Sequence, residues 1–508
     1  MFAPINRIPS DVLSLIPTHR SSEKDLISAV FVCRHWYRTL TQCGTLWSRL
    51  NLTIKVNDRY IKTLLERAKG CPLDITSARL HRVGTLALLS PHAQQLRNLH
   101  FVYNYWSELQ QISEAVSGPL PLLRTLKINA VEFDPLISGA SDPPSLPLFS
   151  GAVNLKKFCL AAEGLPFLNY FAFPNLTTFE ISAMPGEVKF PASQLLDFFE
   201  SSPTLRTVHI GIYAEILLAD VPPTRVVVLP NVEVFTVVTE EEPDYRIATH
   251  ISCPSARRAS FICEQGVEDT EPQEAFPTSV SWDMIVAQYM KGSINEVVLE
   301  ITTASNLASS CSLSFLSPDS TTLELGYRMI TDDDFETDIP LEEKHVEVFS
   351  HASKAIRNHS RLGDVKRFRI KDRPVSLTTL QILGVAKEAE RLFMAMGPLD
   401  ELILDVSDLR PYFNSLRHSP GPGGTGPLNA YPLVKELTII GQPQTLLGGQ
   451  GMAGIVKVAK LRHALGVPFE RVVFRMRDPP VTVVEELGPW VGAVDCYDEI
   501  IGDDQDLI

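Results

Sequence analysis

A short apolar phrase recurs along most of the chain, with the pattern apolar, two variable, apolar, one variable, apolar. Strong copies begin at Leu96, Leu123, Leu155, Leu176, Leu205 and Val232. Weaker copies begin at Ala256, Ile294, Val365, Leu399, Val434 and Phe469. The alternation that ends each phrase predicts a short strand with one buried face.

Stretches with apolar residues at helical spacing lie between several copies, at 192–202, 282–292, 347–360 and 386–397. Successive copies are mostly 20 to 38 residues apart. Most of them follow a proline or a small residue. This order predicts an α/β fold, an irregular leucine-rich-repeat solenoid with parallel strands on its concave face and helices on its convex face. The alternative is an ordinary α/β domain with a mixed sheet, bounded by the proline- and glycine-rich segments 142–150 and 421–427.

The amino-terminal part has a different, purely helical pattern. Apolar residues recur at helical spacing in 8–16 and again in 25–40, and the segment 46–52 adds Trp47 and leucines that close a three-helix bundle. A module of this size buries little apolar surface, so we expect a partner protein to complete its core. The alternative is a helical cap on the repeats, with Trp36 and Trp47 as ordinary core residues.

This amino-terminal pattern resembles an F-box. The matching residues are Ile8-Pro9, Asp11-Val12-Leu13, Leu15-Ile16, Asp25, Val30, Cys33, Trp36, Leu40 and Leu46-Trp47. Ile8 departs from the more usual leucine, and the turn at 17–22 is longer and more polar than in the tightest family examples. The remainder is similar to the irregular repeats of fungal F-box proteins, because it lacks the asparagine or cysteine that usually follows each strand.

The resemblance implies a helix-in-groove contact with a Skp-type adaptor, and through that adaptor with a cullin. The residues implied in adaptor binding are Ile8, Pro9, Asp11, Val12, Leu13, Leu15, Ile16, Val30, Cys33, Trp36, Leu46 and Trp47. We therefore expect an F-box at 1–52, a solenoid at 53–490 and an acidic tail at 491–508, which we expect to fray.

Charge refines this picture of the partners. The net charge of the chain is -14, which disfavours nucleic acid and anionic membrane surfaces as partners. Residues 1–70 contain 11 Lys+Arg against 5 Asp+Glu, so the amino-terminal module suits an acidic partner. Eight scattered cysteines without a C-x-x-C pair, and no long apolar run, predict a cytoplasmic or nuclear protein without disulfides or zinc.

The sequence contains no convincing motif for catalysis or cofactor binding. The glycines at 421–426 are flanked by prolines, and those at 449–454 follow the nearest expected strand, which ends at Ile440, by too long a segment for a phosphate-binding turn. No paired nucleophile and base stands out. We expect no enzyme activity, cofactor or metal site, although a catalytic site assembled from distant residues on an α/β sheet remains the less favoured alternative.

The side chains that alternate with the buried phrase are predicted to line the concave groove and to contact a protein target. They are His100, Lys127, Glu180, His209, Glu300, Arg367, Arg369, Asp405 and Arg475. The sequence as a whole therefore predicts the substrate-recognition subunit of a Skp-cullin-F-box ubiquitin ligase. The alternative is an F-box scaffold that acts outside any ligase.

Overall fold

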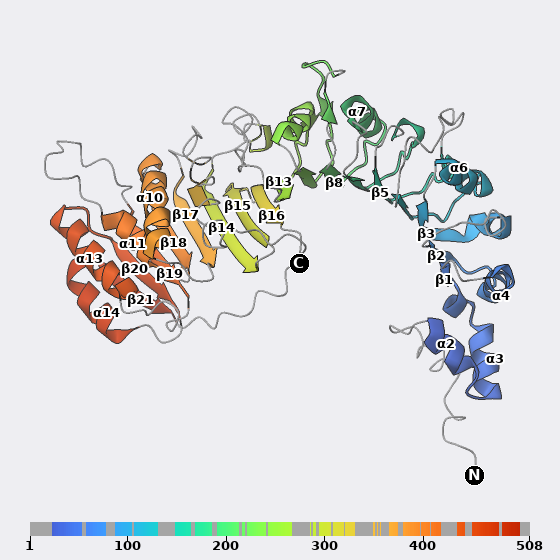
Figure 1. Ribbon diagram of the computed structural model, residues 1–508, viewed down its shortest axis with the longest axis horizontal. Helices are drawn as coiled ribbons and strands as arrows, with labels where there is room; N and C mark the ends of the chain where they lie inside the picture. The colour runs from blue at the N-terminus through green and yellow to red at the C-terminus, as the bar shows by residue number, and fades with distance from the viewer. Residues whose placement is uncertain are drawn as a thin grey trace, which may run out of the picture. The chain divides into compact units, whose positions relative to one another are not determined.

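A computed structural model shows two compact units, residues 1–232 and 233–508 (Figure 1). The structure describes residues 23–52, 57–77, 87–103, 106–130, 148–163, 168–184, 190–212, 216–218, 221–239, 242–266, 285, 288–290, 294–305, 308–319, 321–330, 349–350, 353, 356, 365–373, 379–396, 398–406, 408–417, 434–441, 450–476 and 480–497. Each unit is described by itself.

The described part of the amino-terminal module contains α2 (Glu23–Val30), α3 (Arg34–Gln42) and the short helix η3 (Gly44–Trp47). The expectation of one continuous helix over 25–40 is wrong. The chain leaves α2 through tight bonds from Phe31 and Val32 to the carbonyls three residues earlier, and Cys33 is extended with φ −162°. This turn redirects α3, so that Tyr37 on α3 is exposed whereas Val30 on α2 is buried.

A parallel sheet forms the body of the first unit. Its described strands are β1 (Arg49–Leu52), β2 (Leu73–Ser77), β3 (Leu96–Tyr103), β4 (Thr125–Ala130), β5 (Lys157–Glu163), β6 (Thr178–Met184) and β8 (Thr207–Ile212). Each of these strands pairs in parallel with the next in this order.

Helices and short elements occupy the connections between these strands. They are α4 (Asp58–Ala68), η4 (Ser90–Gln95), α6 (Trp106–Ala115), η5 (Leu168–Tyr170), β7 (Phe190–Pro191), α7 (Ala192–Glu200), β9 (Ile216–Leu217) and β10 (Val227–Val228). Figure 1 shows α4, α6 and α7 on one side of the strands of this unit. A strand, a crossover and a parallel strand therefore alternate throughout.

The core of the first unit lies between the sheet and the crossovers. The apolar phrases stack in register, with Leu99, Leu126, Phe158, Phe179 and Val208 in one buried row. Ring contacts extend this row to helix α7, where the centroid of Phe198 lies 4.5 Å from that of Phe179. Aromatic packing thus fixes which sheet face the crossovers cover.

Polar side chains that lie just before successive strands form hydrogen bonds to backbone carbonyls of the preceding crossover. The amides of Asn154, Asn175 and Asn231 donate to the carbonyls of Pro121, Val153 and Pro203 at 3.0, 2.9 and 3.0 Å. The hydroxyl of Thr204 donates to the Pro174 carbonyl at 3.1 Å in the same way. These bonds satisfy loop carbonyls that the sheet ladder does not reach.

The second unit contains a mixed sheet. Its described strands, in spatial order, are β11 (Val234–Thr239), β13 (Arg258–Gly266), β16 (Thr322–Ile330), β15 (Ala308–Leu316), β14 (Glu296–Ser305), β17 (Arg367–Arg373), β18 (Glu401–Val406), β19 (Glu436–Ile440), β20 (Arg471–Arg475) and β21 (Ala493–Tyr497). Strand β15 is antiparallel to both its neighbours, and the other pairings between these described strands are parallel. The sheet of this unit is therefore mixed.

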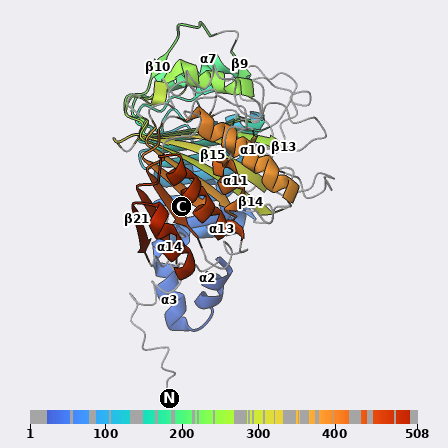
Figure 2. The same ribbon diagram turned by 90° about the vertical axis from the view of Figure 1, so that its left-hand side faces the viewer.

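Helices cover one face of this second sheet, as Figures 1 and 2 show for α10 (Thr379–Ala395), α11 (Arg410–Arg417) and α13 (Gln450–Ala464). The other described elements are η6 (Glu242–His250), β12 (Ile251–Ser252), α14 (Val481–Leu487) and η9 (Gly488–Trp490). Apolar phrase residues such as Phe368, Leu402 and Leu437 are fully buried on this covered face.

The structure confirms a mostly parallel sheet with helices, and every one of the apolar phrases overlaps a strand. It also differs from one sequence expectation. Residues 493–497, expected to fray, form β21, because they pair with β20 and Asp495 contacts Arg471.

Candidate functional site

The amino-terminal module exposes apolar side chains beside the turn between α2 and α3. Phe31 is 78% exposed, and Val32 and Tyr37 are about half exposed. These three residues are called the turn cluster below. A phenylalanine this exposed costs hydration free energy, and neighbouring exposed apolar groups are typical of a protein-binding surface.

The residues predicted to bind the adaptor are less exposed than the turn cluster, where the structure describes them. Ile8, Pro9, Asp11, Val12, Leu13, Leu15 and Ile16 lie outside the described residues. Val30, Trp36 and Trp47 are buried, while Cys33 and Leu46 are half-buried. Phe31 and Val32 were not among the residues predicted to bind the adaptor. Both are apolar residues outside the helical spacing of the buried positions in 25–40, and this feature of the sequence could have identified them.

The helices of this module are joined directly to the first strands of the sheet. The indole nitrogen of Trp47 donates to the Leu40 carbonyl at 2.8 Å, and the guanidinium of Arg67 in α4 lies 4.5 Å from the Trp47 ring centre. Strand β1 begins at Arg49, two residues after η3. The turn cluster and the sheet of the first unit therefore belong to one packed body.

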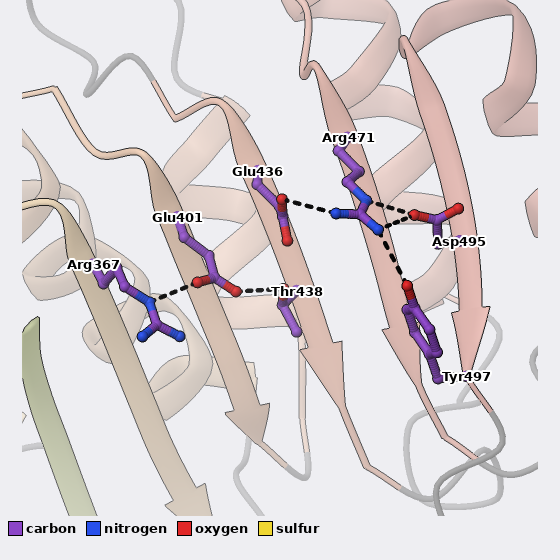
Figure 3. A network of polar contacts seen from close by, with 7 residues as sticks. All are labelled: Arg367, Glu401, Glu436, Thr438, Arg471, Asp495 and Tyr497. Atoms are coloured by element: carbon purple, nitrogen blue, oxygen red, sulfur yellow. Dashed lines mark hydrogen bonds and ion pairs between the residues drawn. The ribbon is translucent and has the colours of Figure 1, made fainter.

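The second unit carries a charged network on the sheet face opposite its helices (Figure 3). Arg367 on β17 donates to Glu401 on β18 at 2.7 Å and to Glu296 on β14 at 3.1 Å. Further along the sheet, Arg471 on β20 lies 3.6 Å from Glu436 and also contacts Asp495. Thr438, on the same strand as Glu436, donates to Glu401 at 2.9 Å.

Other charges on this face are also paired with one another. Arg369 donates to Asp405 at 2.7 Å, and Lys371 lies 3.4 Å from Glu300. Of the residues predicted to bind a target, Glu300, Arg367, Arg369 and Asp405 thus lie together on one polar face, with the exposed Arg475 in the same row as Asp405. Cross-strand ion pairs at this degree of exposure contribute little stability each.

The first unit has a corresponding polar row, which crosses its whole sheet in register. The row consists of Asn51, Thr76, His100, Lys127, Cys159, Glu180 and His209. The remaining predicted target-binding residues, His100, Lys127, Glu180 and His209, therefore lie in a single line. The structure places the predicted residues as two groups, one in each unit.

Cys159 in this row is chemically inert. Burial, followed by the hydrogen bond to Glu180, raises the pKa of the Cys159 thiol to about 12, and the thiol donates to Glu180 at 3.0 Å. Burial opposes ionisation of Glu180, but hydrogen bonds from Cys159 and Lys157 lower its pKa overall. A thiol that keeps its proton is a poor nucleophile.

The pKa of His100 in this row is lowered, first by burial and then by the nearby charge of Lys127. Within the described residues, Nε2 of His100 and Oδ1 of Asn129 on β4 are buried without a hydrogen-bond partner. Buried polar atoms of this kind are uncommon in folded proteins.

Among the residues that the structure describes, no cluster of three or more histidine, cysteine, aspartate or glutamate side chains could hold a metal ion. No described helix is long and apolar enough to cross a membrane. Gly451 and Gly454 of the glycine motif at 449–454 lie inside α13, and a Cβ at Gly454 would meet the Phe413 ring at 3.1 Å.

Comparison with known families identifies the helical module. Residues 5–53 match the family model described as F-box-like. The chain thus carries an F-box-like domain at its amino-terminal end, and such a domain implies a role in binding the Skp-type adaptor of a ubiquitin ligase. A search of curated proteins found no significant match to the chain.

Proposed function

We propose that this chain is the substrate-recognition subunit of a Skp-cullin-F-box ubiquitin ligase. The F-box-like match over residues 5–53 carries the proposal. The exposed turn cluster supports it, because Phe31, Val32 and Tyr37 provide apolar surface that an adaptor would cover. The cullin joins the complex through the adaptor.

In this proposal the body behind the F-box is an irregular leucine-rich-repeat solenoid that holds a protein target. The recurring strand-and-crossover unit and the asparagine and threonine bonds between crossovers support the repeat interpretation. The helix-free polar face of each sheet is the proposed target surface. The chain contributes proximity between target and ubiquitin-conjugating enzyme and no reacting group, so it is not itself an enzyme. Its proposed location is the cytoplasm or nucleus.

The test is co-purification of a recombinant Skp-type adaptor with the full chain. The variant Phe31→Asp/Val32→Asp places charge in the proposed interface and is expected to weaken adaptor binding by at least about tenfold, since each apolar anchor contributes on the order of 1–3 kcal/mol. Val481→Asp is the matched control, because Val481 is 68% exposed on α14. Thermal melting of each variant verifies folding.

Two results would contradict parts of the proposal. A correctly folded wild-type chain that binds no Skp-type adaptor would overturn it. A stable adaptor complex that supports no ubiquitin transfer to any captured protein, with cullin and conjugating enzyme present, would favour a scaffold that acts outside a ligase.

A further inference from the structure

The apolar core of the second unit is uncovered at its last strand. Two rows of side chains cross the sheet in register on the face that the helices cover. One row consists of Phe368, Leu402, Leu437, Val472 and Val494, and the other of Ile370, Leu404, Ile439, Phe474 and Cys496. The members on β17 to β20 are fully buried. On β21, by contrast, Val494 is half-buried and Cys496 is exposed.

Strand β21 also has an open edge. It pairs with β20 on one side, and no other described strand of this unit pairs with it. Figure 3 shows it as the outermost of the strands drawn there. Gly492 donates its backbone N–H to the Phe469 carbonyl at 3.1 Å. Because backbone groups alternate in direction along a strand, those of Ala493 and Asp495 face away from β20.

This edge lacks the usual protection against further pairing. Natural sheets protect open edges with lysine, proline or a bulge. Strand β21 contains neither lysine nor proline, and its register with β20 is unbroken. Its one charged side chain, Asp495, contacts Arg471 within the sheet. The Tyr497 carbonyl accepts from Met476 at 3.3 Å, which closes only the end of the strand.

Charge selects what covers the edge. Residues 480–508 contain eight aspartate and glutamate residues and no lysine, arginine or histidine. Two of the eight, Glu485 and Glu486, are exposed on α14. Repulsion between like charges disfavours a second copy of this end, and it disfavours the chain's own segment 498–508, which carries five of the eight. A basic segment is attracted instead.

We propose that β21 is a docking edge for an extended basic segment of a partner protein, which adds one strand to the sheet of the second unit. The backbone of this segment pairs with Ala493 and Asp495. Its apolar side chains, at alternate positions, cover Val494 and Cys496, and lysine or arginine at the intervening positions lies on the face of Asp495. The docking edge goes beyond the proposed function, because it depends on neither the adaptor nor the ligase.

Fluorescence anisotropy with the full chain measures the binding of three synthetic peptides. The first alternates lysine and valine, and the second replaces each lysine with glutamate. The third has the composition of the first, with its lysines and valines grouped at opposite ends. The alternating basic peptide is expected to bind at least about tenfold more tightly than either of the others. The grouped peptide separates strand pairing from attraction by charge alone.

Substitutions in β21 locate the site. Ala493→Pro removes an N–H that faces away from β20, a position where an edge strand tolerates proline, and is expected to weaken binding about tenfold or more. Ala493→Val keeps the N–H and is expected to preserve binding. Cys496→Lys places a charge in the core row and is expected to weaken binding, whereas Leu383→Lys, at an exposed position of α10, is its matched control.

Equal binding of the alternating and grouped basic peptides overturns this inference, as does binding that survives both Ala493→Pro and Cys496→Lys. Thermal melting verifies that each variant folds, and if one does not, the other decides. Sedimentation tests a second copy as the occupant, since a wild-type dimer that Cys496→Lys dissociates would overturn docking of a partner. Peptide binding that appears only in a chain ending at Tyr497 would overturn it in favour of segment 498–508.

Discussion

Single asparagine and threonine side chains connect successive crossovers of the first unit. Asn154, Asn175, Thr204 and Asn231 each occupy the position before an apolar phrase and bond a carbonyl of the preceding crossover. Leucine-rich repeats usually carry an asparagine or cysteine after the strand. In this chain the bonding residue lies before the strand, where the chain turns into the sheet.

We predict that Asn175→Ala lowers the free energy of unfolding by about 1 kcal/mol, because the Val153 carbonyl loses its 2.9 Å bond. Urea denaturation of the full chain measures this change. Asn129→Ala is the control, since its Oδ1 has no partner within the described residues and its removal is expected to be neutral or slightly stabilising. Equal losses in the two variants would contradict the role given to the Asn175 bond.

At the scale of elements, the last strands of the second unit are held by cross-strand contacts as well as by the ladder. Arg471 on β20 reaches Glu436 on β19 at 3.6 Å and the Tyr497 hydroxyl on β21 at 3.1 Å, and it also contacts Asp495. A single side chain therefore spans three strands, which explains why 493–497 form a strand despite their acidic neighbours.

We predict that Arg471→Met lowers the melting temperature of the second unit at low salt, since several partners lose one shared cation. Lys435→Met is the comparison, because Lys435 forms one exposed pair with Asp400 at 2.7 Å, and its loss is expected to have a smaller effect. Thermal melting at low and high salt measures both changes. A difference between the variants that persists at high salt would argue against an ionic cause.

At the scale of the whole molecule, charge is concentrated by region. The surplus of positive charge in residues 1–70 lies in a chain of net charge -14. Arg34 and Arg38 are exposed on α3, the helix that follows the turn cluster. Long-range attraction to an acidic partner acts mainly on the rate of association.

We predict that Arg34→Glu/Arg38→Glu slows association with a Skp-type adaptor severalfold and changes dissociation little. Stopped-flow or biosensor kinetics at increasing salt measure this effect, and the wild-type association rate is expected to fall as salt rises. Lys457→Glu on α13 makes a smaller charge change outside the F-box-like domain and is expected to leave the rate nearly unchanged. A salt-independent wild-type rate would contradict steering by this module.

Much of the strand order could be read from the sequence, because the apolar phrase is a local property. Each phrase has the two-residue alternation of a half-buried strand, so residues such as Leu99, Phe158 and Leu402 identify themselves as core positions. The F-box resemblance was likewise carried by spaced residues, and the family match over 5–53 agrees with it.

The tertiary structure alone decided how these local elements combine. Strand β21 depends on its pairing with β20, which no pattern within residues 493–497 encodes. Strand β15 runs antiparallel to β14 and β16, and the break between α2 and α3 redirects α3, so the direction of these elements came from the structure. The same holds for the candidate surfaces. The sequence determined which side chains alternate with the buried phrase, but only strand register sets Lys127 beside His100 and gives Arg367 its carboxylate partners, because pairing between strands is a long-range contact.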